Sequence, residues 1–199
     1  MKQPEITDDV HKKMEEYRFK VFNYFDAMID EEKTDETTDP FDPSIPAVSE
    51  DFLLNHDRTS HYFNDETLEV NSFCNMYLMV RPGKSVIQAL NEWVKQQVPG
   101  YCLSHISGFF FYPNNQGFMG WHTNADQVGY RIYLSYAFED NKSFFRYWDY
   151  DKEEIITTWD KAGWNARLFY TSDDPERLYW HCVYSETDRL SIGMEIKEV

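Results

Sequence analysis

The second half of the chain is a succession of short segments rich in aromatic and β-branched residues, each bounded by Asp, Asn, Gly or Pro. Segments with this composition and these boundaries predict strands. We expect strands over 101–112, 129–138, 143–150, 154–159, 166–171, 178–184 and 189–197. Evenly spaced short strands are typical of a jelly roll or a barrel, so the sequence predicts a mainly β domain.

The first half of the chain predicts fewer strands. Apolar residues recur every three or four positions over 8–32, which predicts a helix lying on the outside of a sheet. The acidic, proline-containing stretch 33–50 predicts a linker or an extended strap. A strand over 73–80 and a helix over 85–97 follow, and the Asn-Asn-Gln-Gly turn at 114–117 indicates a hairpin. We therefore divide the chain into an N-terminal helix and strap, 1–50, and a β domain, 51–199.

Charge and composition argue against several classes of partner. The net charge of −16 makes attraction to nucleic-acid phosphates unfavourable, because that attraction depends on Lys and Arg. No apolar run approaches the roughly 18 residues of a membrane helix, and the N-terminus lacks the apolar core of a signal peptide. The three cysteines, an odd number without a CxxC pair, favour a reducing compartment. A cytoplasmic protein without membrane or nucleic-acid contact is expected.

Two histidines in the predicted β domain have spacing that suits a metal site. In an extended strand, residues i and i+2 point the same way, so His122 and Asn124 can face one point. His181, from a distant strand, would complete a three-sided face with open positions for substrate and oxygen. This is the arrangement of the facial triad in non-haem Fe(II) oxygenases. The alternative is a β protein with two core histidines and an exposed arginine.

Arg189 and Ser191 strengthen the metal interpretation. They again lie at i and i+2, eight and ten residues after His181. An arginine fork with a neighbouring hydroxyl can hold a carboxylate by charge-assisted hydrogen bonds.

These residues resemble those of the Fe(II)- and 2-oxoglutarate-dependent dioxygenases, nearest to the prolyl-hydroxylase-like branch. The stretch Phe111-Tyr112-Pro113…Gly120-Trp121-His122-Thr123-Asn124 is similar to the Tyr-Pro…Gly-Trp-His-x-Asp entry of that family. Arg131-Ile-Tyr-Leu-Ser135 resembles the next strand. Arg167-Leu-Phe-Tyr and Trp180-His181-Cys-Val, followed by Arg189-Leu-Ser191, resemble the closing strands. The similarity covers about Phe73 to the C-terminus.

The resemblance implies a double-stranded β-helix (jelly roll) with flanking helices, α+β by content. It implies that His122 and His181 are iron ligands and that Arg189, helped by Ser191, pairs with the distal carboxylate of 2-oxoglutarate. Tyr112 and Tyr133 match places where that branch supplies hydroxyls to the co-substrate.

Asn124 departs from the family pattern, because a carboxylate is expected at this position. An amide oxygen is neutral and binds Fe(II) more weakly, leaving the site one unit more positive. Asn124 either ligates through its side-chain oxygen, or stands aside while two histidines hold iron, or marks a site that has lost its metal. A halide in this position would need a smaller residue. Asp126 is a further candidate for the carboxylate.

The sequence thus predicts an oxygenase of the hydroxylase type, with Fe(II) as cofactor, 2-oxoglutarate and O₂ as co-substrates, and a primary substrate that the sequence does not name. His122, Asn124 and His181 are the expected catalytic and metal-binding residues. A catalytically silent β-helix binding or assembly module is the alternative. A metal-binding, cupin-like enzyme without 2-oxoglutarate is a third possibility.

Overall fold

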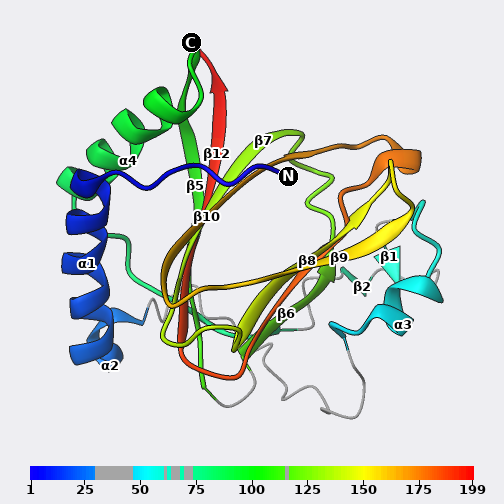
Figure 1. Ribbon diagram of the computed structural model, residues 1–199, viewed down its shortest axis with the longest axis horizontal. Coiled ribbons are helices and arrows are strands. Elements are labelled where there is room, and N and C mark those ends of the chain that lie inside the picture. The colour runs from blue at the N-terminus through cyan, green and yellow to red at the C-terminus, as the bar shows by residue number, and fades with distance from the viewer. Residues whose placement is uncertain (30–46, 61, 64–67, 70–73, 115–116) are drawn as a thin grey trace.

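Two five-stranded antiparallel sheets face each other in the computed structural model, as the jelly-roll prediction requires (Figure 1). The structure describes residues 1–29, 47–60, 62–63, 68–69, 74–114 and 117–199. The first sheet has the order β10 (Gly163–Thr171), β7 (Gly129–Ala137), β12 (Arg189–Glu198), β5 (Tyr101–Tyr112), β4 (Tyr77–Leu78). The second has the order β3 (Cys74–Asn75), β6 (Gly117–His122), β11 (His181–Ser185), β8 (Ser143–Asp149), β9 (Glu154–Trp159). The mainly β fold class is confirmed.

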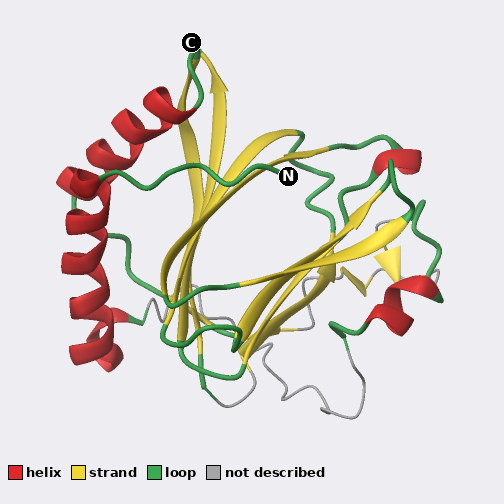
Figure 2. Cartoon of the chain, in the orientation of Figure 1, coloured by secondary structure: helices red, strands yellow, loops and turns green. Residues whose placement is uncertain are grey.

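Two long helices lie along the outer face of the first sheet, and one short helix lies beside the second (Figure 2). On the first sheet lie α1 (Asp8–Asn23) and α4 (Lys84–Gln97), with the short α2 (Phe25–Met28) next to α1. On the second lies α3 (Glu50–Leu54), whose Leu53 packs with the outward-facing side chains of that sheet. A separate pair, β1 (Tyr62–Phe63) with β2 (Leu68–Glu69), and a 3₁₀ turn, η2 (Pro175–Arg177), complete the described elements. None of the described helices is both long and apolar enough to cross a membrane.

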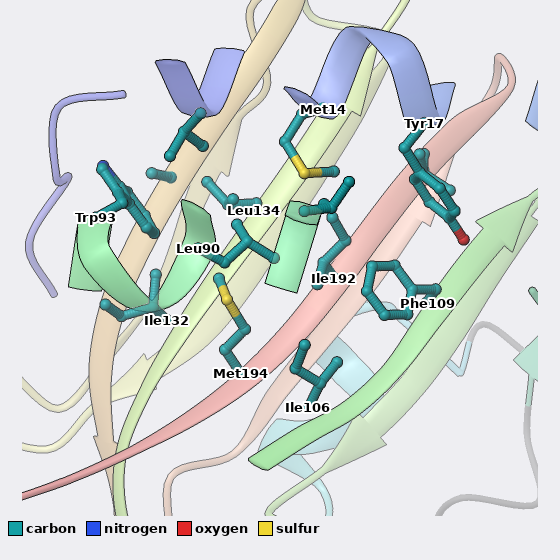
Figure 3. Packing of buried hydrophobic residues seen from close by; sticks show 14 of the residues in the cluster. Met14, Tyr17, Leu90, Trp93, Ile106, Phe109, Ile132, Leu134, Ile192 and Met194 are labelled. Atoms are coloured by element: carbon teal, nitrogen blue, oxygen red, sulfur yellow. The ribbon is translucent and has the colours of Figure 1, made fainter. Parts of the chain in front are cut away.

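The largest apolar core lies between the first sheet and its helices (Figure 3). Met14 and Tyr17 of α1 and Leu90 and Trp93 of α4 pack on alternate residues of β5, β7 and β12, among them Ile192. Successive strand residues point to opposite faces, so the remaining alternate residues point into the space between the sheets. On β7 and β12 most of these inward residues are polar, and they build the site described below.

The segment 73–80, predicted as one strand, is divided between the two sheets. Cys74–Asn75 pairs with β6 in the second sheet, whereas Tyr77–Leu78 pairs with β5 in the first. The predicted hairpin at 114–117 is wrong for a related reason. Its two strands, β5 and β6, lie in different sheets, so the chain passes from one sheet to the other between them; residues 115–116 lie outside the described residues.

The predicted N-terminal helix is shorter than expected. It ends at Asn23, because Tyr24 leaves the helical region with φ −132° and ψ 40°. The helix predicted over 85–97 is confirmed and begins one residue earlier, at Lys84. Residues 30–46, which include most of the predicted strap, lie outside the described residues.

Gly117 provides a test of the packing at the sheet-to-sheet crossing. A Cβ at this position would lie 2.6 Å from the Tyr112 Cβ and 2.8 Å from the Pro113 backbone nitrogen and oxygen. Backbone atoms cannot move aside cheaply, so Gly117→Ala is expected to lower the free energy of unfolding by about 2–3 kcal/mol. Chemical denaturation measures this change. Gly83→Ser is the control, since a Cβ at Gly83 meets nothing within 4 Å; equal effects of the two substitutions would contradict the crossing described here.

Candidate functional site

His122 and His181 lie directly opposite each other between the sheets. His122 is the last residue of β6, His181 is the first of β11, and the two are register partners in neighbouring antiparallel strands. Side chains of opposite residues in such a pair share one face, and here the two ring centroids are 4.0 Å apart. Both side chains are buried. The sequence places the histidines 59 positions apart, and the sheet makes them neighbours.

A tryptophan precedes each histidine and points the other way. Trp121 and Trp180 both belong to the outward cluster that packs against α3. The Trp121 indole N–H donates to the Ser49 carbonyl at 2.7 Å, and the Trp180 indole N–H donates to the Arg58 carbonyl at 2.9 Å. These two hydrogen bonds fix which face of each strand points outward, and therefore keep both imidazoles directed toward the interior.

Each imidazole is oriented by the same backbone contact. His122 Nδ1 lies 2.8 Å from the Gly120 carbonyl oxygen, and His181 Nδ1 lies 2.9 Å from the Tyr179 carbonyl oxygen. A carbonyl only accepts, so in both rings Nδ1 carries the proton and Nε2 keeps its lone pair. Metal-binding histidines are commonly held in this way by a partner of the other ring nitrogen.

Burial favours the neutral form of both rings. Desolvation lowers the pKa of His122 to about 4, against a partly compensating hydrogen bond to Gly120. Desolvation, followed by the neighbouring His122, holds the pKa of His181 well below its ordinary value. Both rings are therefore neutral near pH 7, which is the form that binds a metal ion.

Asn124 reaches the histidine pair by a turn rather than by an extended strand. The strand β6 ends at His122, and Asn124 has a left-handed backbone with φ +52°, a conformation that asparagine adopts more readily than most residues. Its Nδ2 lies 3.3 Å from His181 Nε2 and 3.3 Å from the Tyr133 hydroxyl. The expected convergence of His122, Asn124 and His181 is present, although the extended geometry assumed from the sequence is not.

The suggestion that Asp126 supplies the carboxylate is wrong. Asp126 is exposed, and the described residues contain no group of three or more His, Cys, Asp or Glu side chains arranged to hold a metal ion. The possible metal ligands at this point are therefore the two histidine Nε2 atoms and the Asn124 side-chain amide. Both Nε2 atoms are acceptable ligands of a divalent transition metal, and so is an amide oxygen. Asn124 now directs Nδ2 at His181, so its amide must turn by exchanging Nδ2 and Oδ1 for the residues present to fit such an ion with a neutral ligand set.

Arg189 is held by a buried carboxylate that the sequence did not single out. Its Nε donates to Asp160 Oδ2 at 2.9 Å, while Arg167 contacts Asp160 Oδ1 at 2.7 Å and the Ser143 hydroxyl donates to Oδ2 at 2.6 Å. Asp160 is fully buried, and both arginines are nearly so. Burial alone would raise the pKa of Asp160, but Arg189, Arg167 and the hydroxyl together hold it well below its ordinary value.

This arginine cluster carries a net positive charge and an unused donor. Two guanidinium groups face one carboxylate, and Arg189 Nη1 is buried with no hydrogen-bond partner among the residues that the structure describes. An unpaired buried donor is costly, so its presence indicates a position for an acceptor. The cluster can therefore receive an anion such as a carboxylate.

An aromatic ring connects the histidine pair to the arginine cluster. Phe145 stacks on His181 with centroids 5.3 Å apart, and the Arg167 guanidinium lies 5.5 Å from the centroid of the same Phe145 ring. Tyr133, on the first sheet, accepts a hydrogen bond from Asn124 through its hydroxyl. Its ring packs edge-on with the rings of Phe145 and Phe169. The two polar groups thus share one interior, with apolar walls between them.

The remaining predicted residues also face this interior. Tyr112 is the register partner of Arg189, and its buried ring lies 5.3 Å below the Arg189 guanidinium. Burial raises the pKa of Tyr112 above its ordinary value, so its hydroxyl stays protonated. Ser191, two residues after Arg189 on β12, is buried opposite Ser135 of β7.

Arg131 is a further buried charge that sequence reasoning did not assign. It lies two residues before Tyr133 on β7, and its Nη2 donates to Gln127 Oε1 at 2.6 Å. The same Nη2 forms an ion pair with Glu195 Oε1 at 3.7 Å, and the Glu195 side chain is partly exposed. The signal for Arg131 and Arg167 was a charged residue inside an otherwise apolar strand pattern, whereas Asp160 lies in the connection after β9. Only the fold shows which of these residues meet.

No family model matches the chain, and no curated protein matches it. Among solved structures, it is similar to a prolyl-4-hydroxylase of Pseudomonas putida, with 15% identity over 65% of this chain and 75% of that one, and a TM-score of 0.45. A family 29 carbohydrate-binding module matches more weakly, with 11% identity over 50% of this chain and 76% of that one, and a TM-score of 0.26. Both TM-scores lie below 0.5, so neither likeness assigns a family.

Proposed function

We propose that the chain is an Fe(II)- and 2-oxoglutarate-dependent oxygenase of the hydroxylase type. The observation that carries the proposal is that the space between the two sheets contains two features. One is a pair of buried histidines whose Nε2 atoms are free of the proton. The other is a buried arginine, Arg189, with an unpaired Nη1. The first suits a divalent metal and the second suits a carboxylate, which are the two groups that this co-substrate chemistry combines.

In this proposal the chain holds and orients its ligands. His122 and His181 hold Fe(II), with the Asn124 amide as third ligand, and Arg189 with Ser191 receives the distal carboxylate of 2-oxoglutarate. When bound, these groups supply the oxidation: substrate C–H, O₂ and 2-oxoglutarate give substrate C–OH, succinate and CO₂. Asp160 and Arg167 fix the Arg189 guanidinium, and the rings of Phe145 and Phe169 exclude water from the space between.

Succinate formation tests the activity directly. Purified protein with Fe(II) and 2-oxoglutarate in air is expected to release succinate, because the proposed reaction converts this co-substrate to succinate and CO₂. His181→Ala is expected to abolish this release. Succinate production that is equal in the wild type and His181→Ala would exclude an active site at this histidine pair.

Arg189→Met tests the proposed carboxylate subsite. The substitution removes the charged donor while keeping most of the side-chain volume, and we expect 2-oxoglutarate to bind on the order of 100-fold more weakly. Isothermal titration calorimetry in the presence of a redox-inert divalent metal measures this affinity. Arg177→Met, at an exposed arginine of η2, is the control and should leave the affinity unchanged. A small effect of Arg189→Met in a folded protein would favour a metal enzyme that does not use 2-oxoglutarate.

A catalytically silent binding or assembly module is the second candidate, and one contact favours it. The Asn124 amide, rather than a carboxylate, lies against His181 Nε2 at 3.3 Å, where its N–H can satisfy the lone pair without any metal. A module predicts that His181→Ala removes neither binding nor assembly. The oxygenase predicts the loss of both metal affinity and turnover.

A further inference from the structure

A groove outside the sheet interior has no role in the proposed oxygenase reaction. It lies between α4, the first half of β5 and the end of β12, and has a volume of about 970 Å³. Ile87 of α4 and Leu103 and Ile106 of β5 give it apolar lining. Figure 1 shows these elements side by side, near the C-terminal end of the chain and away from β6 and β11.

The charge of this groove is opposite to that of the chain. The protein has 35 acidic and 19 basic residues, yet the described residues that line the groove include Arg81, Lys84, Lys95 and Lys197 and no Asp or Glu side chain. Lys95 pairs with Glu92 at 2.9 Å. Within the described part of the chain, Lys84 and Lys197 form no ion pair. A basic groove on a strongly acidic surface concentrates the attraction for an anionic partner in one place.

One wall of the groove is an unpaired sheet edge. The edge strand β4 pairs with β5 only at Phe110 and Phe111, so residues 101–108 of β5 have no strand neighbour on that side among the described residues. Two side chains occupy the edge instead. Asn91 Oδ1 accepts from the Leu103 N–H at 3.0 Å, and Arg81 Nη2 donates to the Ile106 carbonyl at 3.1 Å.

Such an edge matches the backbone of an extended peptide. An added strand forms main-chain hydrogen bonds with the edge, and its alternate side chains enter neighbouring pockets. Asn91 and Arg81 occupy two of the edge positions through flexible side chains, which an incoming backbone can replace. Lys84 and Lys95 are eleven residues apart on α4, or about 16 Å at the helical rise. This length corresponds to about five residues of extended chain.

We propose that this groove binds an extended acidic segment of a partner protein, added as a strand to the free edge of β5. Apolar side chains at alternate positions of the segment pack on Ile87, Leu103 and Ile106. The intervening acidic side chains contact Lys84, Lys197 and their basic neighbours. A small anion would use the lysines alone, without the edge or the apolar lining.

A synthetic peptide with alternating valine and glutamate, seven residues long and fluorescently labelled, is a suitable probe. Fluorescence anisotropy with the full chain, in the absence of Fe(II) and 2-oxoglutarate, is expected to show saturable binding that weakens as salt increases. Omitting both ligands makes the result independent of the oxygenase proposal. No binding up to ~1 mM peptide, which corresponds to only about 4 kcal/mol, would overturn the proposal.

Charge-reversal variants locate the binding. The double variant Lys84→Glu, Lys197→Glu is expected to weaken the affinity for the peptide by on the order of tenfold or more. The control, Lys12→Glu with Lys20→Glu, changes the net charge equally on the exposed side of α1 and should change the affinity less than about twofold. Equal losses in the two double variants would indicate a general charge effect and overturn the assignment to this groove.

Backbone methylation separates strand addition from simple anion binding. Two peptides are compared, N-methylated on the odd or on the even residues, because only one set of N–H groups can face the β5 edge. We expect one of the two to lose binding and the other to keep it. If both bind as well as the parent, and inorganic pyrophosphate displaces all three, the groove is a small-anion site and the proposed strand addition is wrong.

Discussion

Replacing Asp160 with asparagine is expected to lower the free energy of unfolding by about 3–5 kcal/mol, because it leaves two buried guanidinium groups without a counter-charge. Asp160 is fully buried and contacts Arg167 at 2.7 Å and Arg189 at 2.9 Å. Asparagine has nearly the same shape, so the loss measures charge rather than packing. Urea denaturation at pH 7 gives this difference.

The control for this substitution is Asp151→Asn, at an exposed carboxylate near the β8–β9 connection. Its effect should be within about 0.5 kcal/mol, the usual range for such surface changes. A loss below about 1 kcal/mol for Asp160→Asn would mean that the arginine cluster is hydrated or rearranged, contrary to the buried geometry described here.

The same carboxylate makes stability depend on pH in a defined direction. The folded-state pKa of Asp160 lies below its ordinary value of 3.8. Its stabilisation is therefore complete above about pH 5 and is lost as the pH falls below the ordinary value toward the folded-state one. The stability difference between the wild type and Asp160→Asn should accordingly be largest near neutral pH and shrink in acid. A difference that grows below pH 4 would contradict this sign.

Asn124→Asp is expected to tighten Fe(II) binding by on the order of tenfold or more, because it places a negative charge beside two neutral imidazoles. The side chain already lies 3.3 Å from His181 Nε2. The Tyr133 hydroxyl, now 3.3 Å from the amide nitrogen, can turn to donate to the new carboxylate. Anaerobic competition with a coloured chelator measures the affinity.

A matched control exists for this substitution. Asn141 is also an asparagine with a left-handed backbone, at φ +59°, but it lies on an exposed turn. Asn141→Asp should leave the metal affinity unchanged. If Asn124→Asp also leaves it unchanged while His181→Ala removes it, then the two histidines hold the metal alone and Asn124 stands aside.

Local patterns in the sequence predicted most individual elements of the fold. The strands over 101–112 and 154–159 have the predicted bounds, because turn residues end each of them. The pattern could not show that 73–80 changes sheets or that β5 and β6 are not a hairpin. Both depend on which strands pair across the whole chain, and strand composition does not encode partners.

The same limit explains what the sequence missed in the site. His122 and His181 could be selected because, with Arg189 and Ser191 after them, their order suits a site for a metal and an oxoacid. Asp160 follows a strand in a polar stretch, where a surface carboxylate is the ordinary expectation. Its burial depends on contacts with Arg167, in the middle of β10, and Arg189, at the start of β12, and only the assembled sheets reveal them.

The central claim, that one sheet interior binds both a metal ion and an oxoacid, is tested most directly by an anaerobic titration. Fe(II) and 2-oxoglutarate are added separately and then together, and the visible absorption spectrum is recorded. We expect a charge-transfer band only when both are present, because it requires the oxoacid bound to the metal. The band should be lost in His181→Ala and should need more 2-oxoglutarate in Arg189→Met. A folded wild-type protein that develops no band with both ligands at saturation would contradict the proposed oxygenase.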